Sequence, residues 1–220
     1  MVLPAPVSKQ RVLMTGFDPF GIDTINPSWL AVQALHGREV AGHRIVAAQL
    51  PTVFGESVDA LRALLVAHQP ALVICVGQAG GRSAISLERV AININDARIA
   101  DNAGAQPIDT QVAAQGPAAY FSTLPIKAMM LAIRNEGIAA EVSQTAGTFV
   151  CNHVFYGLMN ALAGMPALRA TRGGFIHVPW LPTQGAPSMP LSDMVRGLQA
   201  AVASALRTGR DAGVSAGAEH

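Results

Sequence analysis

The sequence is poor in cysteine and in charge. Only two cysteines occur among 220 residues, Cys75 and Cys151, and charged residues make up 13%. A domain of this length does not need a single disulfide to hold its core together, and a reducing compartment would keep both thiols free. The formal net charge of +1 gives no electrostatic reason to expect nucleic acid or a membrane surface as a partner.

Long uninterrupted hydrophobic runs are also missing, although half of the residues are apolar. The most apolar stretch, residues 60–76, is broken by Arg62 and by the polar residues 68–69, so it falls short of the roughly 18 apolar residues that a spanning helix needs. The first ten residues do not combine a basic segment with an apolar one, as a secretion signal would. We therefore expect a soluble, cytoplasmic protein with no membrane partner.

Short buried runs alternate with longer helical ones, a pattern typical of the α/β class. The clearest strand covers residues 71–77 (ALVICVG), because its continuous apolar run suits a sheet covered on both faces. Further strands are predicted over residues 11–16, 43–49, 140–143 and 174–179. Helices are predicted over residues 27–36, 57–69, 125–135, 151–162 and 191–206. Residues 85–95 are expected to form an excursion hairpin, and residues 96–120 a long structured loop of the kind that is often functional.

No internal repeat and no change of composition marks a second domain. We therefore assign residues 11–208 to one α/β domain and residues 1–10 to an N-terminal extension. Residues 209–220 are rich in Gly and Ala and are expected to form a disordered tail.

Cys151 stands at the predicted start of a helix. The apolar residues that follow it recur at helical spacing, namely Val154, Phe155, Leu158, Met159 and Leu162. In the first helical turn, unpaired N–H groups and the positive end of the helix dipole favour the nucleophilic thiolate, and they can hold a developing oxyanion. A buried structural thiol is the alternative, and it is the preferred interpretation of Cys75, which lies within an apolar strand.

A thiol nucleophile needs a base that can also protonate a leaving amine, and histidine does both near neutral pH. His177 lies near the end of a predicted strand, where α/β proteins place their sites; a structural histidine is the alternative interpretation. His153 is closer in sequence, but two positions along a helix turn by about 200°, so residues 151 and 153 point to opposite sides. The same geometry argues against a metal pair there, and no other cluster has enough ligands, so no metal is expected.

The residues alone leave open which carboxylate would orient the imidazole. The candidates in loop-rich surroundings are Asp18, Glu88, Asp96, Asp101 and Asp109. The glycine-rich turn at residues 77–82 matches neither the dinucleotide-binding nor the Walker spacing. We interpret it as a tight turn that lets backbone approach a ligand, or simply as a turn.

Nine segments, in order, resemble pyroglutamyl peptidase type I, the pyrrolidone-carboxylate peptidase family of cysteine peptidases. The resemblance runs from about Arg11 to Pro182. The segments are TGFDPFG (15–21), NPS (26–28), PTVF (51–54), VGQAGGR (76–82), ERVAININD (88–96), DNAGAQPID (101–109), GPAAYFSTLPIK (116–127), SQTAGTFVCNH (143–153) and GGFIHVPWLP (173–182).

The resemblance implies a catalytic triad of Cys151, His177 and Glu88, and it implies that Arg98 lies beside the acyl carbonyl and helps to hold the oxyanion. On the residues alone, Glu88 would instead be a solvated partner of Arg89. The resemblance further implies a substrate pocket made by Phe17, Phe20, Thr52, Gln78, Ile99, Phe149 and Val150.

The implied fold is a single-domain, three-layer α/β/α sandwich with a mixed, mostly parallel, twisted sheet. The implied activity is hydrolysis of an N-terminal pyroglutamyl (5-oxoprolyl) residue from peptides through a thioester acyl-enzyme. Apolar walls and a donor–acceptor pair suit this neutral lactam. No cofactor is implied, and the implied assembly is a homo-oligomer, either a tetramer or a dimer.

Two other functions remain possible at this point. A nucleoside-phosphorylase-like transferase would need a phosphate site, for which Arg82 and Ser83 beside the glycine-rich turn are the only suggestion. A non-catalytic protein that binds pyroglutamyl or other modified peptide N-termini would need no intact triad.

Overall fold

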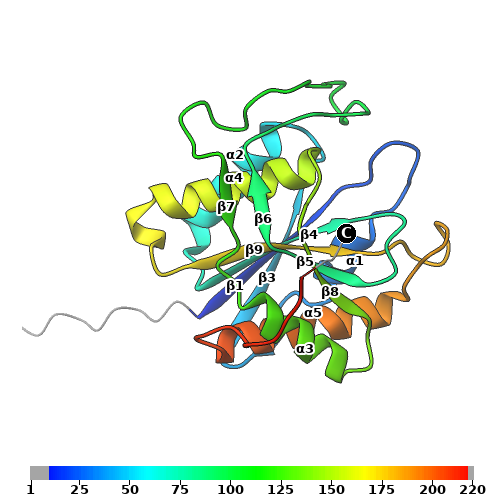
Figure 1. Cartoon of the computed structure of the whole chain (residues 1–220), viewed down its shortest axis with the longest axis vertical. Coiled ribbons are helices and arrows are strands. Elements are labelled where there is room, and N and C mark those ends of the chain that lie inside the picture. The colour runs from blue at the N-terminus through cyan, green and yellow to red at the C-terminus, as the bar shows by residue number, and fades with distance from the viewer. Residues whose placement is uncertain (1–9, 218–220) are drawn as a thin grey trace, which may run out of the picture.

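The computed structural model describes residues 10–217, and its centre is a seven-stranded sheet (Figure 1). The strand order is β2-β3-β1-β4-β9-β5-β8. The strands are β1 (Arg11–Phe17), β2 (Glu39–Val40), β3 (His43–Leu50), β4 (Leu72–Gln78), β5 (Ile85–Glu88), β8 (Ala140–Ser143) and β9 (Arg172–Val178).

The sheet is mixed but mostly parallel. Strands β3, β1, β4 and β9 run parallel to one another, and β5 runs parallel to β8, whereas the contacts β2–β3 and β5–β9 are antiparallel. The parallel register aligns Gly77 at the end of β4 with His177 at the end of β9. Because the carboxyl ends of parallel strands meet at one edge of the sheet, this edge is where the fold gathers loops and functional side chains.

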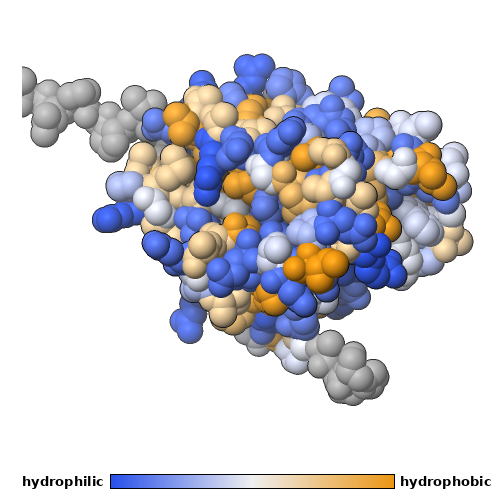
Figure 2. Space-filling view, turned by 90° about the horizontal axis from the view of Figure 1, so that it is seen from above, coloured by the Kyte–Doolittle hydropathy of each residue, from blue (hydrophilic) through white to orange (hydrophobic). Residues whose placement is uncertain are grey.

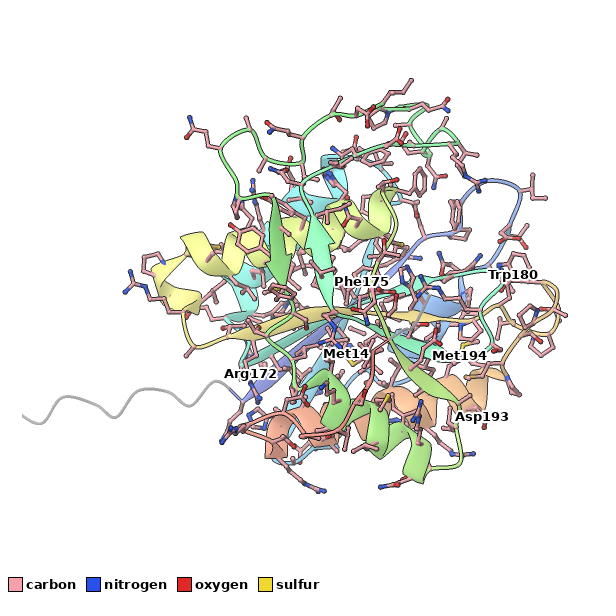
Figure 3. All side chains as sticks on the ribbon, in the orientation of Figure 1. Met14, Arg172, Phe175, Trp180, Asp193 and Met194 are labelled. Atoms are coloured by element: carbon pink, nitrogen blue, oxygen red, sulfur yellow. The ribbon has the colours of Figure 1, made fainter. Side chains whose placement is uncertain are left out.

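Five α-helices cover the two faces of the sheet (Figure 1). They are α1 (Pro27–Gln33), α2 (Glu56–His68), α3 (Ile126–Asn135), α4 (Val150–Gly164) and α5 (Leu191–Arg207). Helices α1, α3 and α5 share one apolar core with Met14 of β1, while α2 and α4 share the other with Phe175 of β9. Figure 3 shows Met14 and Phe175 on either side of the sheet. The predicted three-layer α/β/α sandwich is confirmed.

Residues 85–95 do not form the hairpin that the sequence suggested. Residues 85–88 are fully buried and join the main sheet as β5, while residues 90–92 form β6, which pairs with β7 (Ala119–Phe121) in a separate two-stranded sheet. The sequence indicates extended structure in this segment, but it does not carry information on which distant strand completes the pairing. The long loop between β6 and β7 extends outward beyond α2 and α4 (Figure 1).

The C-terminal segment, which the sequence predicts to be a disordered tail, contacts the fold over the part that the structure describes, residues 209–217. The Asp211 carboxylate accepts hydrogen bonds from the backbone N–H groups of Lys127 (3.2 Å) and Ala128 (2.9 Å) in the first turn of α3. Ala216 packs against the core on the same side of the sheet. Residues 1–9, which make up most of the expected N-terminal extension, and residues 218–220 lie outside the described residues.

The surface over α2, α4 and the long loop is a mosaic of hydrophilic and hydrophobic residues (Figure 2). Among the described residues, no helix is long and apolar enough to cross a bilayer. The large apolar side chains that stand most exposed are scattered over several loops and elements: Ile22, Val66, Ile99, Ile108 and Phe121.

Candidate active site

Cys151 is the second residue of α4, which begins one residue before the predicted start. The N–H groups of the first helical turn have no acceptor within a helix, so they are available to an anionic group beside the thiol. A Cβ atom on Gly77 would lie only 2.8 Å from the Cys151 Sγ. The absence of a side chain at residue 77 therefore leaves room for the thiol at the end of β4.

His177 reaches the same place from β9. It is the cross-strand neighbour of Gly77, and its ring lies 4.9 Å from that of Phe175, which belongs to the core shared with α4. Cys151 and His177 line one pocket. The strand end therefore presents the imidazole to the face of the sheet on which the thiol lies.

Glu88, the last residue of β5, lies behind His177. Its Oε1 is 2.8 Å from His177 Nδ1 and 2.7 Å from an Arg82 guanidinium nitrogen, and the carboxylate is completely buried. Because a carboxylate oxygen accepts, the bond assigns the proton to Nδ1 and leaves Nε2 as the basic nitrogen. Glu88 is thus a buried partner of His177 and Arg82, whereas the half-buried Arg89 donates to Gln144.

The surroundings of the site lower the pKa of the Glu88 carboxyl but raise the pKa of the Cys151 thiol. Burial alone would raise the pKa of Glu88, but the hydrogen bond and charge of His177, together with Arg82, outweigh burial and lower it. Burial, and then the charge of Glu88, raise the pKa of Cys151 to about 12, although Arg82 acts against this rise. Burial and Glu88 therefore oppose the ionisation of the Cys151 thiol, whereas the start of α4 and Arg82 favour it.

A cavity of about 160 Å³ opens beside the thiol. Its walls are largely apolar, since Phe149 packs against the rings of Phe20 (6.1 Å) and Phe54 (5.4 Å). The residues that line it are Phe17, Phe20, Asn26, Thr52, Gln78, Ala146, Phe149, Val150, Cys151 and His177. Six of the seven predicted pocket residues are thus brought together with Cys151 and His177.

Arg98 and Ile99 lie elsewhere. Both are exposed and line a neighbouring hollow with Asp96 and Thr148, which meets the cavity only at Phe149. The structure does not bring Arg98 to the wall of the cavity that holds Cys151. Its predicted place beside an acyl carbonyl would therefore require substrate to extend into the neighbouring hollow.

The other carboxylates left open by the sequence include two that organise loops. Asp18 accepts the Thr52 backbone N–H at 2.7 Å, which holds one wall of the cavity. Asp101 accepts the backbone N–H groups of Ala103 and Ala105 in its own loop and that of Phe54 in the loop before α2. Among the described residues, Glu88 is the carboxylate with a hydrogen bond to His177.

The prediction that His153 points away from Cys151 is confirmed. Its Nε2 accepts the Gly55 N–H at 3.0 Å, and its Nδ1 lies 2.9 Å from the Asn95 side-chain oxygen. Burial lowers the pKa of His153 to about 4. Cys75 is fully buried in β4, and burial raises the pKa of its thiol to about 12, which agrees with a structural thiol.

Sequence reasoning missed how the glycine-rich turn after β4 is used. A Cβ on Gly80 would lie 2.2 Å from the Trp180 indole, so this residue lets the ring pack against the turn, and Figure 3 places Trp180 near the end of β9. The turn then carries Arg82 to Glu88. Backbone packing against Trp180 thus explains Gly80, and the commitment of Arg82 to Glu88 removes the sequence hint of a phosphate site.

A side-chain network at the cavity rim was also missed. Asp23 Oδ2 accepts from the side-chain amides of Gln78 (3.2 Å) and Gln184 (3.1 Å), and Gln184 also donates to Gln78. This network ties the 18–23 loop to the loop after β9. No sequence signal identifies it, because residues 23 and 184 are distant and neither belongs to a regular element. No group of three or more metal-ligating side chains occurs among residues 10–217.

A thiol, an imidazole with one basic nitrogen and a buried carboxylate at one end of a parallel sheet characterise cysteine-dependent hydrolases of the α/β class. A family model described as pyroglutamyl peptidase matches residues 10–208. The pyrrolidone-carboxylate peptidase of Cupriavidus taiwanensis is 61% identical over 214 residues, which cover 95% of this chain and 99% of that protein.

Solved structures agree with this match. Pyroglutamyl peptidase I of Bacillus amyloliquefaciens is 50% identical with a TM-score of 0.90, over 92% of this chain and 100% of that one. The pyrrolidone carboxyl peptidase of Thermococcus litoralis is 34% identical with a TM-score of 0.86, over 90% and 93% of the two chains. The chain belongs to the pyroglutamyl peptidase family, and it is a cysteine-type hydrolase.

Proposed function

We infer that this protein removes an N-terminal pyroglutamyl residue from peptides, with Cys151 as nucleophile, His177 as base and Glu88 as the group that orients the imidazole. The observation that carries the proposal is the pairing of the His177–Glu88 hydrogen bond with a thiol on the same small cavity. Family membership supports the substrate class.

The cavity suits a pyroglutamyl ring. The ring is a neutral five-membered lactam, so binding it requires apolar walls and a few polar partners but no buried counter-charge. Phe17, Phe20 and Phe149 supply the walls, while Thr52 and Gln78 supply polar groups at the lining. A charged, free α-amino group would enter this environment without a carboxylate partner, because Glu88 is already committed to His177 and Arg82.

The first chemical step couples proton transfer to attack. Burial raises the pKa of the Cys151 thiol, so the mechanism needs a base: His177 Nε2 takes the Cys151 proton as the sulfur bonds to the pyroglutamyl carbonyl carbon. The carbonyl oxygen becomes an oxyanion, and the N–H groups at the start of α4 are the donors proposed to hold it. Glu88 stabilises the imidazolium that forms, because its carboxylate accepts from Nδ1.

The second half releases both products. The tetrahedral intermediate collapses, the carbon–nitrogen bond breaks, and the imidazolium gives its proton to the departing peptide amine. A pyroglutamyl thioester remains on Cys151. Water then attacks the thioester with His177 as base, so that pyroglutamate leaves and the thiol recovers its proton.

Arg98 is proposed to contact the substrate where the peptide leaves the cavity. This role is supported by its place in the hollow next to Phe149, together with Ile99. A peptide that reaches from the cavity into this hollow would bring its backbone past Arg98. The donors at the start of α4, which lie beside the thiol, would then carry more of the oxyanion than Arg98 does.

The proposal includes a cytoplasmic location and a homo-oligomer of two or four chains. Two free cysteines, one of them at the site, support a reducing location. Light scattering after size-exclusion chromatography measures the assembly directly, and a monomeric mass at micromolar concentration would contradict the oligomer.

The function is tested with a fluorogenic amide of pyroglutamate, comparing the wild type with Cys151→Ala and Cys75→Ala. We expect turnover by the wild type and by Cys75→Ala, and none by Cys151→Ala. Equal activity in all three proteins would contradict the cysteine mechanism. Binding of pyroglutamate without any turnover by the wild type would instead indicate a binding protein.

A further inference from the structure

Arg82 stands where three parts of the site meet. It lies in the turn after β4, and one guanidinium nitrogen donates to Glu88 Oε1 at 2.7 Å. The other terminal nitrogen donates to the Thr145 carbonyl oxygen at 3.2 Å. The loop that contains Thr145 leads directly into α4 and Cys151, so one side chain connects the carboxylate with the loop before the nucleophile.

The contact with Glu88 falls on an oxygen that is already in use. The same Oε1 accepts from His177 Nδ1 at 2.8 Å. The Glu88 side chain is fully buried, whereas that of Arg82 is 28% exposed. A buried carboxylate that lost its cation would tend to take up a proton, and a neutral carboxyl stabilises an imidazolium less well than a carboxylate does.

The groups facing Glu88 come from several elements. His177 faces it from β9 and Arg82 from the turn, Ser143 lies near it at the end of β8, and the charge of Glu88 reaches Cys151 on α4. Its chain neighbour Arg89 points to Gln144 instead. Among these described neighbours, Arg82 is the one side chain that is cationic irrespective of the state of the imidazole.

We propose that Arg82 is a positioning residue for the hydrolysis, which fixes the Glu88 carboxylate against the loop before Cys151 and keeps it an anionic acceptor for His177. The proposal rests on the proposed function. It also explains why the turn after β4 carries arginine. The planar guanidinium can donate to Glu88 Oε1 and to the Thr145 carbonyl oxygen at once, whereas a lysine ammonium is a single point charge.

The charge has a measurable consequence. Without Arg82 the pKa of Glu88 rises, because burial is then opposed by fewer favourable interactions. The acid limb of the kcat/KM profile should therefore move to higher pH in Arg82→Gln, and kcat should fall. A purely structural loss would lower activity at every pH without moving the limb.

Arg89→Gln is the matched control. It removes an arginine adjacent to Glu88 that also binds the 144–149 loop but leaves Glu88 untouched. We expect its pH profile to superimpose on that of the wild type. In a Glu88→Gln background, Arg82→Gln should produce no further shift, and a shift there would overturn the proposal by showing that Arg82 acts on the thiol.

The outcomes separate this proposal from the proposed function. Absence of pyroglutamyl turnover in the wild type removes the function and the proposal with it. Normal wild-type turnover with superimposable profiles of Arg82→Gln and Arg89→Gln overturns only the role of Arg82. If Arg82→Gln does not fold, Arg82→Lys decides: a kcat about tenfold below that of Arg89→Lys supports the proposal, and an equal kcat overturns it.

Discussion

At the scale of single residues, the site depends on side chains that are missing as well as on those present. Gly77, the second-last residue of β4, lies beside both His177 and the Cys151 thiol, and an added Cβ would lie 2.8 Å from Sγ and 2.8 Å from the Phe175 ring. The Phe175 ring is fully buried in a packed core, so an added Cβ would press on the thiol. The position of the thiol is therefore set from the sheet as well as from its own helix.

Gly77→Ala should consequently cost activity. Displacing the thiol by a few tenths of an ångström or more disturbs its alignment with His177, and we expect kcat/KM to fall by roughly 100-fold or more. Steady-state hydrolysis of a pyroglutamyl amide measures this. The control is Gly164→Ala, at the exposed C-terminal end of α4, where an added Cβ meets nothing within 4 Å. Unchanged activity in Gly77→Ala would show that the thiol has more freedom than its packing suggests.

Single residues also mark how far sequence reasoning reaches. The helical spacing after Cys151 and the strand before His177 predict where these two side chains stand. The partner of His177 could not be chosen from spacing, because Glu88 is 89 residues away and the contact depends on the antiparallel entry of β5 beside β9. Only the family resemblance selected it. Gly77 and Arg82 were missed for the same reason, since their contacts cross between elements.

At the scale of elements, buried polar contacts join helices to the long loop. His153 on α4 accepts the Gly55 N–H at the start of α2 and lies against Asn95 at the start of the long loop. Gly55 has a φ of 78° and no side chain, so this helix start has no cap of its own. His153 thus supplies from a neighbouring helix an acceptor that a capping residue would normally provide.

This contact predicts a loss of stability in acid. The pKa of His153 is lowered to about 4 in the folded protein, from an ordinary value of 6.5. The unfolded chain takes up the proton first, so stability present above pH 6.5 is lost as the pH falls toward 4, by up to about 3 kcal/mol. Urea denaturation between pH 6.5 and 4 should show that the free energy of unfolding falls more steeply with decreasing pH in the wild type than in His153→Gln. His68→Gln serves as the control, and equal slopes in all three proteins would contradict the contact.

The one element whose pairing was predicted wrongly is the segment of residues 85–95. Residues 85–95 were expected to form one excursion hairpin, but residues 85–88 and 90–92 belong to different sheets. Each segment is short, and its best partner is remote: β9 and β8 for the first, and β7 for the second. A strand pattern identifies a strand but not its partner. The continuous apolar run of β4 predicts a strand in the centre of the sheet whichever strands lie beside it.

At the scale of the whole molecule, the C-terminal segment stabilises the layer opposite the site. Asp211 accepts from the first-turn N–H groups of α3, whose own N-terminal residue, Pro125, makes no side-chain cap. The segment also passes Arg172, which donates to the Thr208 carbonyl oxygen at 2.7 Å. Composition rich in small residues suggested disorder, but two backbone contacts suffice to hold the segment against the fold.

Asp211→Ala should therefore destabilise the protein without changing its chemistry. Losing a helix-capping carboxylate costs about 1 kcal/mol, so the unfolding midpoint falls while kcat and KM stay at wild-type values, because α3 lies on the far face from Cys151. Thermal and urea unfolding measure the midpoint, and hydrolysis of a pyroglutamyl amide measures kcat and KM. The adjacent Arg210→Ala is the control, and a midpoint equal to the control would contradict the cap.

The central claim is that Cys151 carries the pyroglutamyl group as a thioester, and rapid acid quench followed by mass spectrometry tests it most directly. The wild type is mixed with an activated pyroglutamyl ester, for which release of the acyl group from the enzyme limits turnover. We predict one pyroglutamyl group on the peptide that contains Cys151, which hydroxylamine removes and which is absent from Cys151→Ala. Turnover in the wild type without that adduct, or with the adduct on Cys75, would contradict the account.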